Sequence, residues 1–543
     1  MKKVFLLFIC SISILNAQIF TSKSQVVFPQ VKTGMRDSSQ IFIENNSSLP
    51  VDVKLFKKSS SVFLIRDTLF TIPSNEKHSL QIYYSPSQNV IDKDVLIFQS
   101  VDRLHSAAIA LQGSGKYGDM YDASTFNLFD NDLKSALTDL VKNHTALGYN
   151  TGRDRMFDTI DKRSGDTIEC VYTGRKVKAA NRTAAQNQNF NTEHTWPQSN
   201  FNQAEPMKSD IFHLFPTDVD ANSRRSNYPF GKVVSGQTWS VGGSKLGNDS
   251  YGSQVFEPRD KHKGFAARSV LYFQIRYPNN YGNYLKSSQE EVMREWNKSF
   301  SVTSIETARN SSIAVYQKNR NPFIDHPEFV DRIYSFISST VSPKNPEMDL
   351  SLSEIYFDST FVGDTSQVYL HVVNYGKADL SFTSVSNSNK KNFSYSTIAS
   401  VKSKEFISIK LIFSPDLSGE IHDTLKIVSN AGSKSIPIKG VGILTNSIEE
   451  QTELLADEFE LYQNYPNPFN PKTVIRFHIP SSKFIKLQVY DILGREVQTL
   501  VDEVKSAGIY EVMFNSSILP SGTYYYKLTS GSYQIVKKMM ILK

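Results

Sequence analysis

The chain has 543 residues, a length that predicts several domains. Beyond its first residues it contains no apolar run long enough to span a membrane, which excludes an integral membrane protein built of helices. The formal net charge is only +6, and positive and negative residues almost balance over residues 117–343. The chain therefore does not attract polyanions by bulk charge, and any phosphate-binding surface has to be local.

The N-terminus has the pattern of a secretory signal peptide. Lys2 and Lys3 precede an apolar segment over 4–15, and Ala17 supplies a small residue for cleavage. We expect residues 1–17 to be removed, which leaves Cys170 as the single cysteine of the mature chain. An exported protein without an intramolecular disulfide has to be stabilised by core packing. Cys170 lies in a strand-like alternation and is interpreted as a small buried hydrophobe.

Two segments are copies of one module, which we delimit as residues 18–116 and 344–444. Six positions recur at one constant offset, and each copy closes with Gly-x-Gly. The matched positions are Phe28, Gly34, Asn45, Ser85, Asp94 and Ser100 in the first copy, and Phe357, Gly363, Asn374, Ser414, Asp423 and Ser429 in the second. Short alternating segments with regular turns predict β-sandwiches. They resemble the immunoglobulin-like modules called choice-of-anchor or ASH-type domains. We favour a spacer role, with carbohydrate or partner binding as the alternative.

Between the copies we place a domain over residues 117–343. Residues 128–143 have helical spacing, with Leu133, Leu137 and Val141 on one face. A strand is predicted over 168–172, and a Gly- and Ser-rich loop over 239–252. The domain is long enough to bury a core of its own.

The segment 191–231 concentrates the residues that suit catalysis. Glu193 and His194 are adjacent, and we expect a strand to end near them. A helix is predicted over 218–226 with Thr217 as its N-cap, which places Asn222 and Arg225 on one face. A histidine, oxygen donors and arginines together suit a general base, a metal site and phosphate contacts.

This segment resembles the ββα-metal (His-Me finger) motif of the endonuclease I family of secreted bacterial nucleases. The resemblance rests on Glu193-His194, on Asp210 with Leu214 and Pro216, and on Asn222 with Arg225-Ser226-Asn227 and Phe230. It implies an α+β nuclease fold in which His194 is the general base. Glu193 and Asn222 would hold one divalent ion, Mg²⁺ with Ca²⁺ or Mn²⁺ as alternatives, because hard oxygen ligands suit such ions. Arg225 is a candidate for the arginine that stabilises the transition state.

Two later stretches, 256–277 and 306–330, also resemble this family. The first would place Glu257 before a helix that carries Lys263 and Arg268. We assign Arg224, Lys263 and Arg268 as candidate nucleic-acid contacts. Two further residues are candidate supports of the site, namely Glu257 and His213. A zinc site formed by His194, His213 and Cys170 is the less favoured alternative, because the spacing matches no zinc pattern.

The C-terminal part begins after an acidic linker at 445–458. Strands are predicted over 486–490, 509–514, 523–529 and 534–542. The YPNPFNP signature and the end pattern around Lys537-Lys538 resemble the type A C-terminal sorting domain of the type IX secretion system, here residues 459–543. The resemblance implies contact with that secretion machinery. It also implies a secreted protein, or one that is attached to the cell surface.

The whole chain is thus predicted to be multidomain, with an α+β nuclease between two immunoglobulin-like β-sandwiches and a C-terminal β-sandwich sorting domain. We expect a metal-dependent endonuclease of low sequence specificity that cuts DNA and leaves 5′-phosphate ends. Two alternatives stay open: a secreted ribonuclease, and a surface adhesin that binds extracellular DNA without cleaving it. The sequence indicates no oligomeric state.

Overall fold

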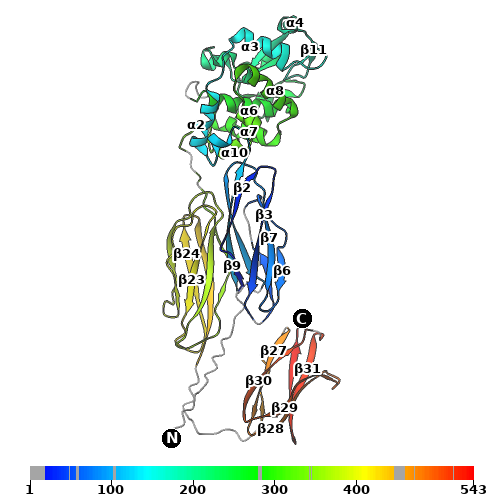
Figure 1. Ribbon diagram of the computed structural model, residues 1–543, viewed down its shortest axis with the longest axis vertical. Coiled ribbons are helices and arrows are strands. Elements are labelled where there is room, and N and C mark those ends of the chain that lie inside the picture. The colour runs from blue at the N-terminus through cyan, green and yellow to red at the C-terminus, as the bar shows by residue number, and fades with distance from the viewer. Residues whose placement is uncertain are drawn as a thin grey trace. The chain divides into compact units, whose positions relative to one another are not determined.

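The computed structural model describes residues 19–47, 49–56, 60–101, 105–278, 284–340, 343, 345–444, 459–469, 471–517 and 519–542 (Figure 1). The chain divides into two compact units, Met1–Leu444 and Thr445–Lys543. The predicted signal peptide and acidic linker lie outside the described residues. Among the helices that are described, none is long and apolar enough to cross a membrane.

The first part of unit 1 consists of two sheets that enclose one core. One sheet is antiparallel, and the other is mixed because β2 pairs parallel to β9. Their strand orders are β1-β3-β7-β5 and β2-β9-β8-β4-β6. The strands are β1 (Ile19–Thr21), β2 (Gln25–Lys32), β3 (Asp37–Asn45), β4 (Val51–Leu55), β5 (Phe63–Ile65), β6 (Leu69–Ile72), β7 (Lys77–Tyr84), β8 (Ile91–Ser100) and β9 (Ser106–Lys116). Alternate residues of these strands are buried, as in β7, because one face of each sheet covers the core.

A second pair of sheets follows the helical domain in the chain. The strand orders are β17-β20-β23-β22 and β18-β25-β24-β21, and β19 also pairs with β25. The strands are β17 (Met348–Leu350), β18 (Ile355–Tyr356), β19 (Thr360–Phe361), β20 (Ser366–Asn374), β21 (Phe382–Ser386), β22 (Phe393–Tyr395), β23 (Phe406–Phe413), β24 (Gly419–Ser429) and β25 (Gly432–Ile443).

Positions that recur in the sequence have matching environments in the two pairs of sheets. The amide of Asn45 donates to three backbone carbonyls at 2.7–3.1 Å, and the amide of Asn374 donates to two at 2.7 and 3.1 Å. A Cβ at Gly113 would overlap the ring of Tyr84, just as one at Gly440 would overlap a phenylalanine ring of β23. The recurring glycines therefore let an aromatic ring pack directly on the backbone.

The domain between the two pairs of sheets is mainly helical (cyan to green in Figure 1). Its helices are α1 (Asp122–Thr125), α2 (Asp130–Val141), α3 (Tyr149–Arg155), α4 (Arg182–Gln186), α5 (Val219–Arg225), α6 (Asp260–Arg276), α7 (Ser287–Ser299), α8 (Ser304–Gln317), α9 (Pro322–Asp325) and α10 (Phe329–Arg332). Short helical turns are η1 (Met156–Ile160), η2 (Gln198–Phe201), η3 (Met207–Ser209) and η4 (Ile211–His213). Its strands are β10 (Thr167–Glu169), β11 (Lys176–Lys178), β12 (Phe190–His194), β13 (Leu214–Asp218), β14 (Ser235–Val241), β15 (Ser244–Asn248) and β16 (Gln254–Glu257).

The predicted helix over 128–143 is confirmed as α2, which buries Leu133, Leu137 and Val141. The predicted loop over 239–252 is wrong for most of its length, because β14 and β15 form a hairpin there. Gly242 and Gly243 form its turn with φ of 62° and 96°. These glycines supply the left-handed backbone that a tight turn needs, so the residues that suggested a loop instead join two strands.

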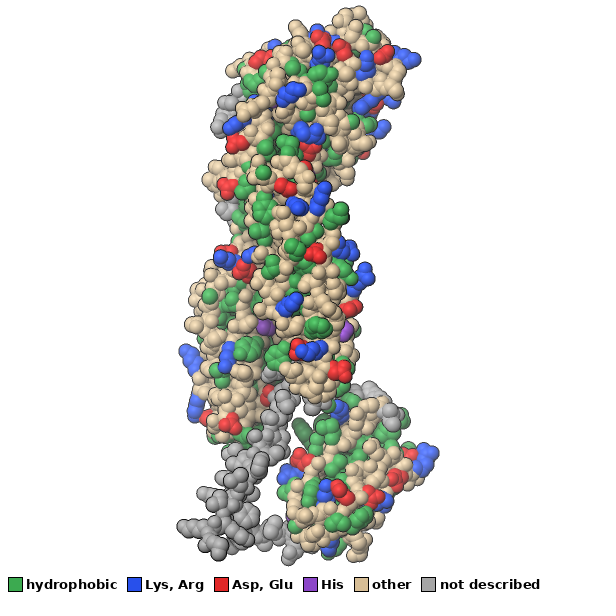
Figure 2. Space-filling model, in the orientation of Figure 1, with side chains coloured by type: hydrophobic (Ala, Val, Ile, Leu, Met, Phe, Trp, Pro, Cys, Tyr) green, Lys and Arg blue, Asp and Glu red, His purple; other side chains and the backbone are tan. Residues whose placement is uncertain are grey.

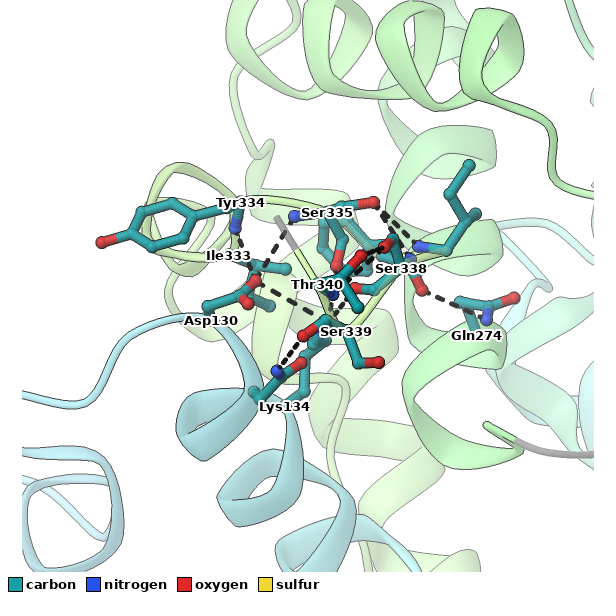
Figure 3. A network of polar contacts seen from close by, with 12 residues as sticks. Asp130, Lys134, Gln274, Ile333, Tyr334, Ser335, Ser338, Ser339 and Thr340 are labelled. Carbon is teal, nitrogen blue, oxygen red and sulfur yellow. Dashed lines mark hydrogen bonds and ion pairs between the residues drawn. The ribbon is translucent and has the colours of Figure 1, made fainter. Parts of the chain in front are cut away.

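The last segment of this domain, residues 334–338, is hydrogen-bonded to side chains of α2 and α6 (Figure 3). The carboxylate of Asp130 accepts from the backbone N–H of Tyr334 at 3.0 Å, and Lys134 donates to two carbonyls of the 335–338 segment. Gln274 of α6 donates to a third carbonyl of that segment at 3.3 Å. These bonds satisfy backbone groups that no strand or helix pairs, so the segment is held without regular structure.

Unit 2 has two sheets with strand orders β26-β27-β30 and β29-β28-β31-β32. The strands are β26 (Glu460–Leu461), β27 (Lys472–Ile479), β28 (Lys483–Tyr490), β29 (Glu496–Lys505), β30 (Gly508–Asn515), β31 (Gly522–Ser530) and β32 (Tyr533–Ile541). The four predicted strands are confirmed as β28, β30, β31 and β32. Their buried faces, with those of β27, form one core.

Candidate active site

The adjacent pair Glu193-His194 ends strand β12, which runs antiparallel to β13. Glu193 lies opposite Phe215 and His194 lies opposite Leu214. Helix α5 begins directly after β13 and packs against β12. The mostly apolar run of Ile211 to Pro216 is buried, so β13 lies in the interior of the domain, and its pairing with β12 places Glu193 and His194 there.

The predicted helix over 218–226 is observed as α5, but its N-cap differs from the predicted one. Asp218, not Thr217, occupies the N-cap position, and its side chain makes no capping bond. The Asp218 carboxylate instead contacts Arg175 and Thr173, while Thr217 is the buried residue before it in β13. Because the Asp218 carboxylate is bound to Arg175 and Thr173, the first turn of α5 has no side-chain cap.

The carboxylate of Glu193 is buried beside a buried arginine. Its Oε1 lies 3.1 Å from Nε of Arg225, and the two side chains are 3% and 1% exposed. Neither of these two atoms has a hydrogen-bond partner of good geometry among the described residues. Burial raises the pKa of Glu193 to about 6, although Arg225 and Tyr172 act in the opposite direction. An anionic oxygen without a hydrogen bond in such a place is suited to a cation.

His194 is held in one tautomer by a backbone carbonyl. Its Nε2 lies 3.2 Å from the carbonyl oxygen of Lys208, which can only accept, so Nε2 carries the proton. Nδ1 is then the basic nitrogen, and it accepts from the amide of Gln198 at 3.2 Å. Burial, the largest effect, and the neighbouring His213 both hold the pKa of His194 well below its usual value. The imidazole is therefore neutral at neutral pH and able to take a proton.

Arg225 is part of the interior of the domain. Its guanidinium donates to the carbonyl oxygens of Thr195 and Ser226 and to the hydroxyl of Tyr284, at 2.7–2.8 Å. Together with the contact to Glu193, these bonds use most of its donors. The role of Arg225 as the arginine that stabilises the transition state stays a prediction; its side chain is 1% exposed, so contact with a phosphate would require rearrangement. Its place suits the positioning of Glu193.

Asn222 and Arg224 lie on the more exposed part of α5. Asn222 is half-buried, and no described residue forms a hydrogen bond with its amide. It precedes Arg225 by three residues and so shares the face of α5 that carries that arginine. Arg224 is 54% exposed and lies 3.6 Å from Asp220, a loose contact that leaves it available to a ligand.

The residues assigned on α6 differ from expectation. Arg268 is 1% exposed and forms two bonds of 2.6 and 2.8 Å with Glu306, so it does not face nucleic acid. Lys263 lies between two carboxylates, at 2.7 Å from Glu257 and 2.8 Å from Asp260. Glu257 also accepts from the backbone N–H of Val233 at 3.0 Å. These interactions account for the α6 residues as structural ion pairs, which the sequence could not distinguish from phosphate contacts.

His213 supports the site from the core. Its ring centroid lies 5.2 Å from that of His194, and its Nε2 donates to the carbonyl of Met207 at 2.7 Å. Burial lowers the pKa of His213 to about 4, so it packs against His194 as a neutral ring. The zinc alternative fails, because no three His, Cys, Asp or Glu side chains in the described part of the chain are grouped to hold a metal. The sulfur of Cys170 is buried and accepts backbone N–H groups from Thr173 and Asp218.

Three residues near His194 were not identified from the sequence. The ring of Tyr149 lies 5.5 Å from the His194 ring, with Arg153 stacked over it at 4.1 Å and the ammonium of Lys208 at 4.8 Å. Nε of Arg153 is buried without a hydrogen-bond partner. Tyr149 and Arg153 are four residues apart on α3, a spacing that brings side chains together on a helix. That spacing was a signal available in the sequence, although nothing there linked it to His194.

On the visible face of the helical domain, positive charge is not gathered into one patch (Figure 2). Figure 2 shows lysine and arginine side chains interspersed with acidic ones on the visible face. The local cations around His194 are therefore the ones that matter for a polyanion.

The helical domain is similar to known proteins. Residues 130–328 match the family model described as Endonuclease I. The protein called extracellular ribonuclease from Bacillus amyloliquefaciens is 34% identical over 222 residues, which are 37% of this chain and 73% of that protein. The protein of the same name from Bacillus subtilis (strain 168) is 32% identical over 222 residues, 37% of this chain and 74% of that protein.

The other parts of the chain match models of their own. Residues 463–542 match a secretion system C-terminal sorting domain, and residues 15–108 match the ASH family. One solved structure, the ASH / PapD-like domain of human CEP192, is 13% identical and spans 22% of this chain and 99% of that chain, with a TM-score of only 0.18. The sorting domain is that of type IX secretion, so the protein is secreted or on the cell surface. With these matches, and with relatives that share a third of their residues over most of their length, the chain belongs to the endonuclease I family.

Proposed function

We propose that the protein is a metal-dependent endonuclease of low sequence specificity that hydrolyses phosphodiester bonds of DNA. The observation that carries this proposal is the state of His194. Its imidazole is neutral, its proton is fixed on Nε2 by a carbonyl, and its Nδ1 lone pair meets only the amide of Gln198. A neutral, oriented imidazole is what general-base catalysis requires at neutral pH.

The residues beside His194 fit a divalent ion. Within the part of the chain that the structure describes, the buried Oε1 atom of Glu193 has no hydrogen-bond partner, and no residue forms a hydrogen bond with the half-buried Asn222 amide on the neighbouring helix. Two oxygen donors of this kind suit Mg²⁺, Ca²⁺ or Mn²⁺. When bound, the ion would supply positive charge that stabilises the phosphate and the leaving 3′ oxygen.

The chain's own residues would perform the other tasks. Nδ1 of His194 takes a proton from the attacking water, and the resulting charge is shared with Nε2, whose N–H donates to the carbonyl of Lys208. The ammonium of Lys208 and the guanidinium of Arg153, both beside Tyr149, would bind phosphate. Arg225 would keep Glu193 ionised, because its charge lowers the pKa of that carboxyl. Attack in line would leave 5′-phosphate ends.

A second candidate differs in the polymer. Both relatives are called extracellular ribonucleases, which favours RNA as the substrate. No base-reading element is apparent in the sequence, so low sequence specificity is expected for either polymer. A surface protein that binds nucleic acid without cutting it would have no use for the arrangement at His194.

The test uses the chain from residue 18 onward with plasmid DNA and, separately, structured RNA, in Mg²⁺ or EDTA. His194→Ala should abolish cleavage. His422→Ala should leave it unchanged, because this histidine of β24 is 62% exposed and lies outside the helical domain. Cleavage that requires metal and His194 supports the nuclease, and the preferred polymer decides between DNA and RNA. Binding without any cleavage by folded protein would refute the enzyme.

A further inference from the structure

A cavity separate from the surroundings of His194 lies between β13 and the first turns of α6 and α8. It has a volume of about 340 Å³, within the range of small-molecule sites. Its walls come from Phe215 on β13, His262 and Phe265 on α6, and Thr303 and Ile305 at the start of α8.

One wall of this cavity is aromatic. The ring of His262 lies 4.8 Å from that of Phe215, edge to face, and is stacked on Phe265 at 5.9 Å. Phe215 and Phe265 are 6.3 Å apart. Such a wall suits a flat ring, because aromatic pairs at these separations attract one another.

The acidic residues of the cavity are neutralised, while two of its cations are not. Asp161 is paired with Arg309, and Glu169 with Arg259. Arg163 and Lys261 also line the cavity, are exposed, and have no ion pair among the described residues. The rim therefore has net positive charge that an anionic group could meet.

His262 gives the cavity wall a buried polar atom that could bond to a polar ligand. The residue is 3% exposed, and its Nε2 has no hydrogen-bond partner among the described residues. Burial and two arginines, Arg259 and Arg309, lower the pKa of His262 to about 3, so the ring is neutral. A neutral imidazole offers one donor and one acceptor, and a native buried polar atom without a partner calls for an explanation.

We propose that this cavity binds a single nucleotide, with its base against Phe265 and His262 and its phosphate on Arg163 and Lys261. The inference rests on the proposed nucleic-acid substrate. The nucleotide would be either a free mononucleotide released by cleavage or one unit of a bound strand. The cavity is close to the proposed metal residue, because Phe215 in its wall lies opposite Glu193 in the pairing of β12 with β13.

The test measures binding without cleavage, so that it does not depend on the active site. The chain from residue 18 onward with His194→Ala is titrated calorimetrically with adenosine 5′-monophosphate, with inorganic phosphate and with a short single-stranded oligonucleotide. The double variant Arg163→Ala/Lys261→Ala should weaken nucleotide binding about tenfold, the loss of two charge-assisted contacts. The matched control Lys142→Ala/Lys298→Ala removes two exposed charges elsewhere in the domain and should change binding less than about twofold.

A second variant separates binding from folding. His262→Phe keeps an aromatic ring and removes Nε2, which has no hydrogen-bond partner among the described residues, so the Tm should stay the same or rise. Nucleotide binding should nevertheless fall about fivefold, as for a lost polar contact. Binding of the mononucleotide supports a site for the cleavage product. Binding of the oligonucleotide alone supports a site for one unit of a bound strand. In either case the ligand should bind more weakly to Arg163→Ala/Lys261→Ala.

Three outcomes would overturn the proposal: no binding of either ligand, equal binding by the double variant and its control, or phosphate binding as tightly as the nucleotide. If the parent protein with His194 cuts neither polymer while nucleotide binding follows these variants, the proposed nuclease function fails and the nucleotide site stands.

Discussion

The buried pair of Glu193 and Arg225 gives a prediction whose size follows from the structure. Replacing Arg225 with methionine keeps an unbranched apolar stem and removes the guanidinium group with its charge. The change breaks the 3.1 Å contact with Glu193 and the bonds to Thr195, Ser226 and Tyr284. Glu193 would then be a carboxylate that is 3% exposed and has no cationic partner.

The expected loss is about 3–5 kcal/mol of unfolding free energy, the usual result of removing one partner of a buried ion pair. Because Arg225 lowers the pKa of Glu193, that pKa should rise above its present value of about 6. Glu193 would be largely protonated at neutral pH, and the proposed metal-dependent cleavage should fall with it. Adding Glu193→Gln removes the stranded charge, so the double variant should be about 1–3 kcal/mol more stable than the sum of the two single losses predicts.

The chain offers a selective probe for this measurement. All three of its tryptophans, Trp196, Trp239 and Trp296, lie in the helical domain, so their fluorescence reports unfolding of this domain alone. Urea titrations at pH 7.5 of the parent, both single variants and the double variant complete a double-mutant cycle. Lys298→Met serves as the control, because Lys298 is an exposed cation at the end of α7.

Two results would refute this reasoning. A loss below about 1 kcal/mol for Arg225→Met would mean that the pair is not a buried ion pair in solution. Strictly additive losses would mean that Glu193 and Arg225 do not interact, whatever their separation.

Three further predictions concern other parts of the chain. The stability of the helical domain should fall as the pH is lowered from 6.5 toward 4. In this range His213 and His262 are protonated in the unfolded chain but stay neutral in the folded domain, because burial lowers their pKa values. Each histidine then lowers the free energy of unfolding by about 1.4 kcal/mol per pH unit. Glu193 acts oppositely between pH 6 and 4.5, so a pH titration of tryptophan fluorescence that showed stabilisation would contradict the assignment. Arg332→Ala should cost about 2–4 kcal/mol in urea titrations, since this 2% exposed guanidinium binds several buried acceptors; a loss under about 0.5 kcal/mol would be inconsistent with those bonds. Deleting residues 459–543 should retain the protein in the periplasm, and unchanged release measured by fractionation would argue against sorting.

Helices and strands could be predicted from the sequence where a local pattern of apolar and polar residues determines them. The helical spacing of Leu133, Leu137 and Val141 predicted α2, because burying one face of an amphipathic helix decides its placement. The strand residues before Glu193 and the helix that carries Asn222 were also predicted, since an apolar run followed by a polar, helix-compatible segment has few other solutions.

The environment of each charged residue could not be predicted in the same way. Arg268 and Arg225 occupy family-like positions, yet one is bound to Glu306 and the other to Glu193 in the interior. Both partners are distant along the sequence from the arginine they bind, and tertiary pairing leaves no periodic signal. The group of Tyr149, Arg153 and Lys208 beside His194 was missed for the same reason.

Because several arginines are paired in the interior and not exposed, the domain has to bind a polyanion through other cations. Arg225, Arg268 and Arg309 are buried against carboxylates, so these three arginines are not available to a polyanion. Phosphate contacts then depend on exposed or partly exposed cations, namely Arg153 and Lys208 beside His194, Arg224 on α5, and Arg163 and Lys261 at the proposed nucleotide cavity. Few contacts release few counterions, so affinity should be moderate and fall only gently with salt. For an enzyme that has to leave one site and cut another, weak and local binding is compatible with turnover, whereas a broadly basic surface would hold the product.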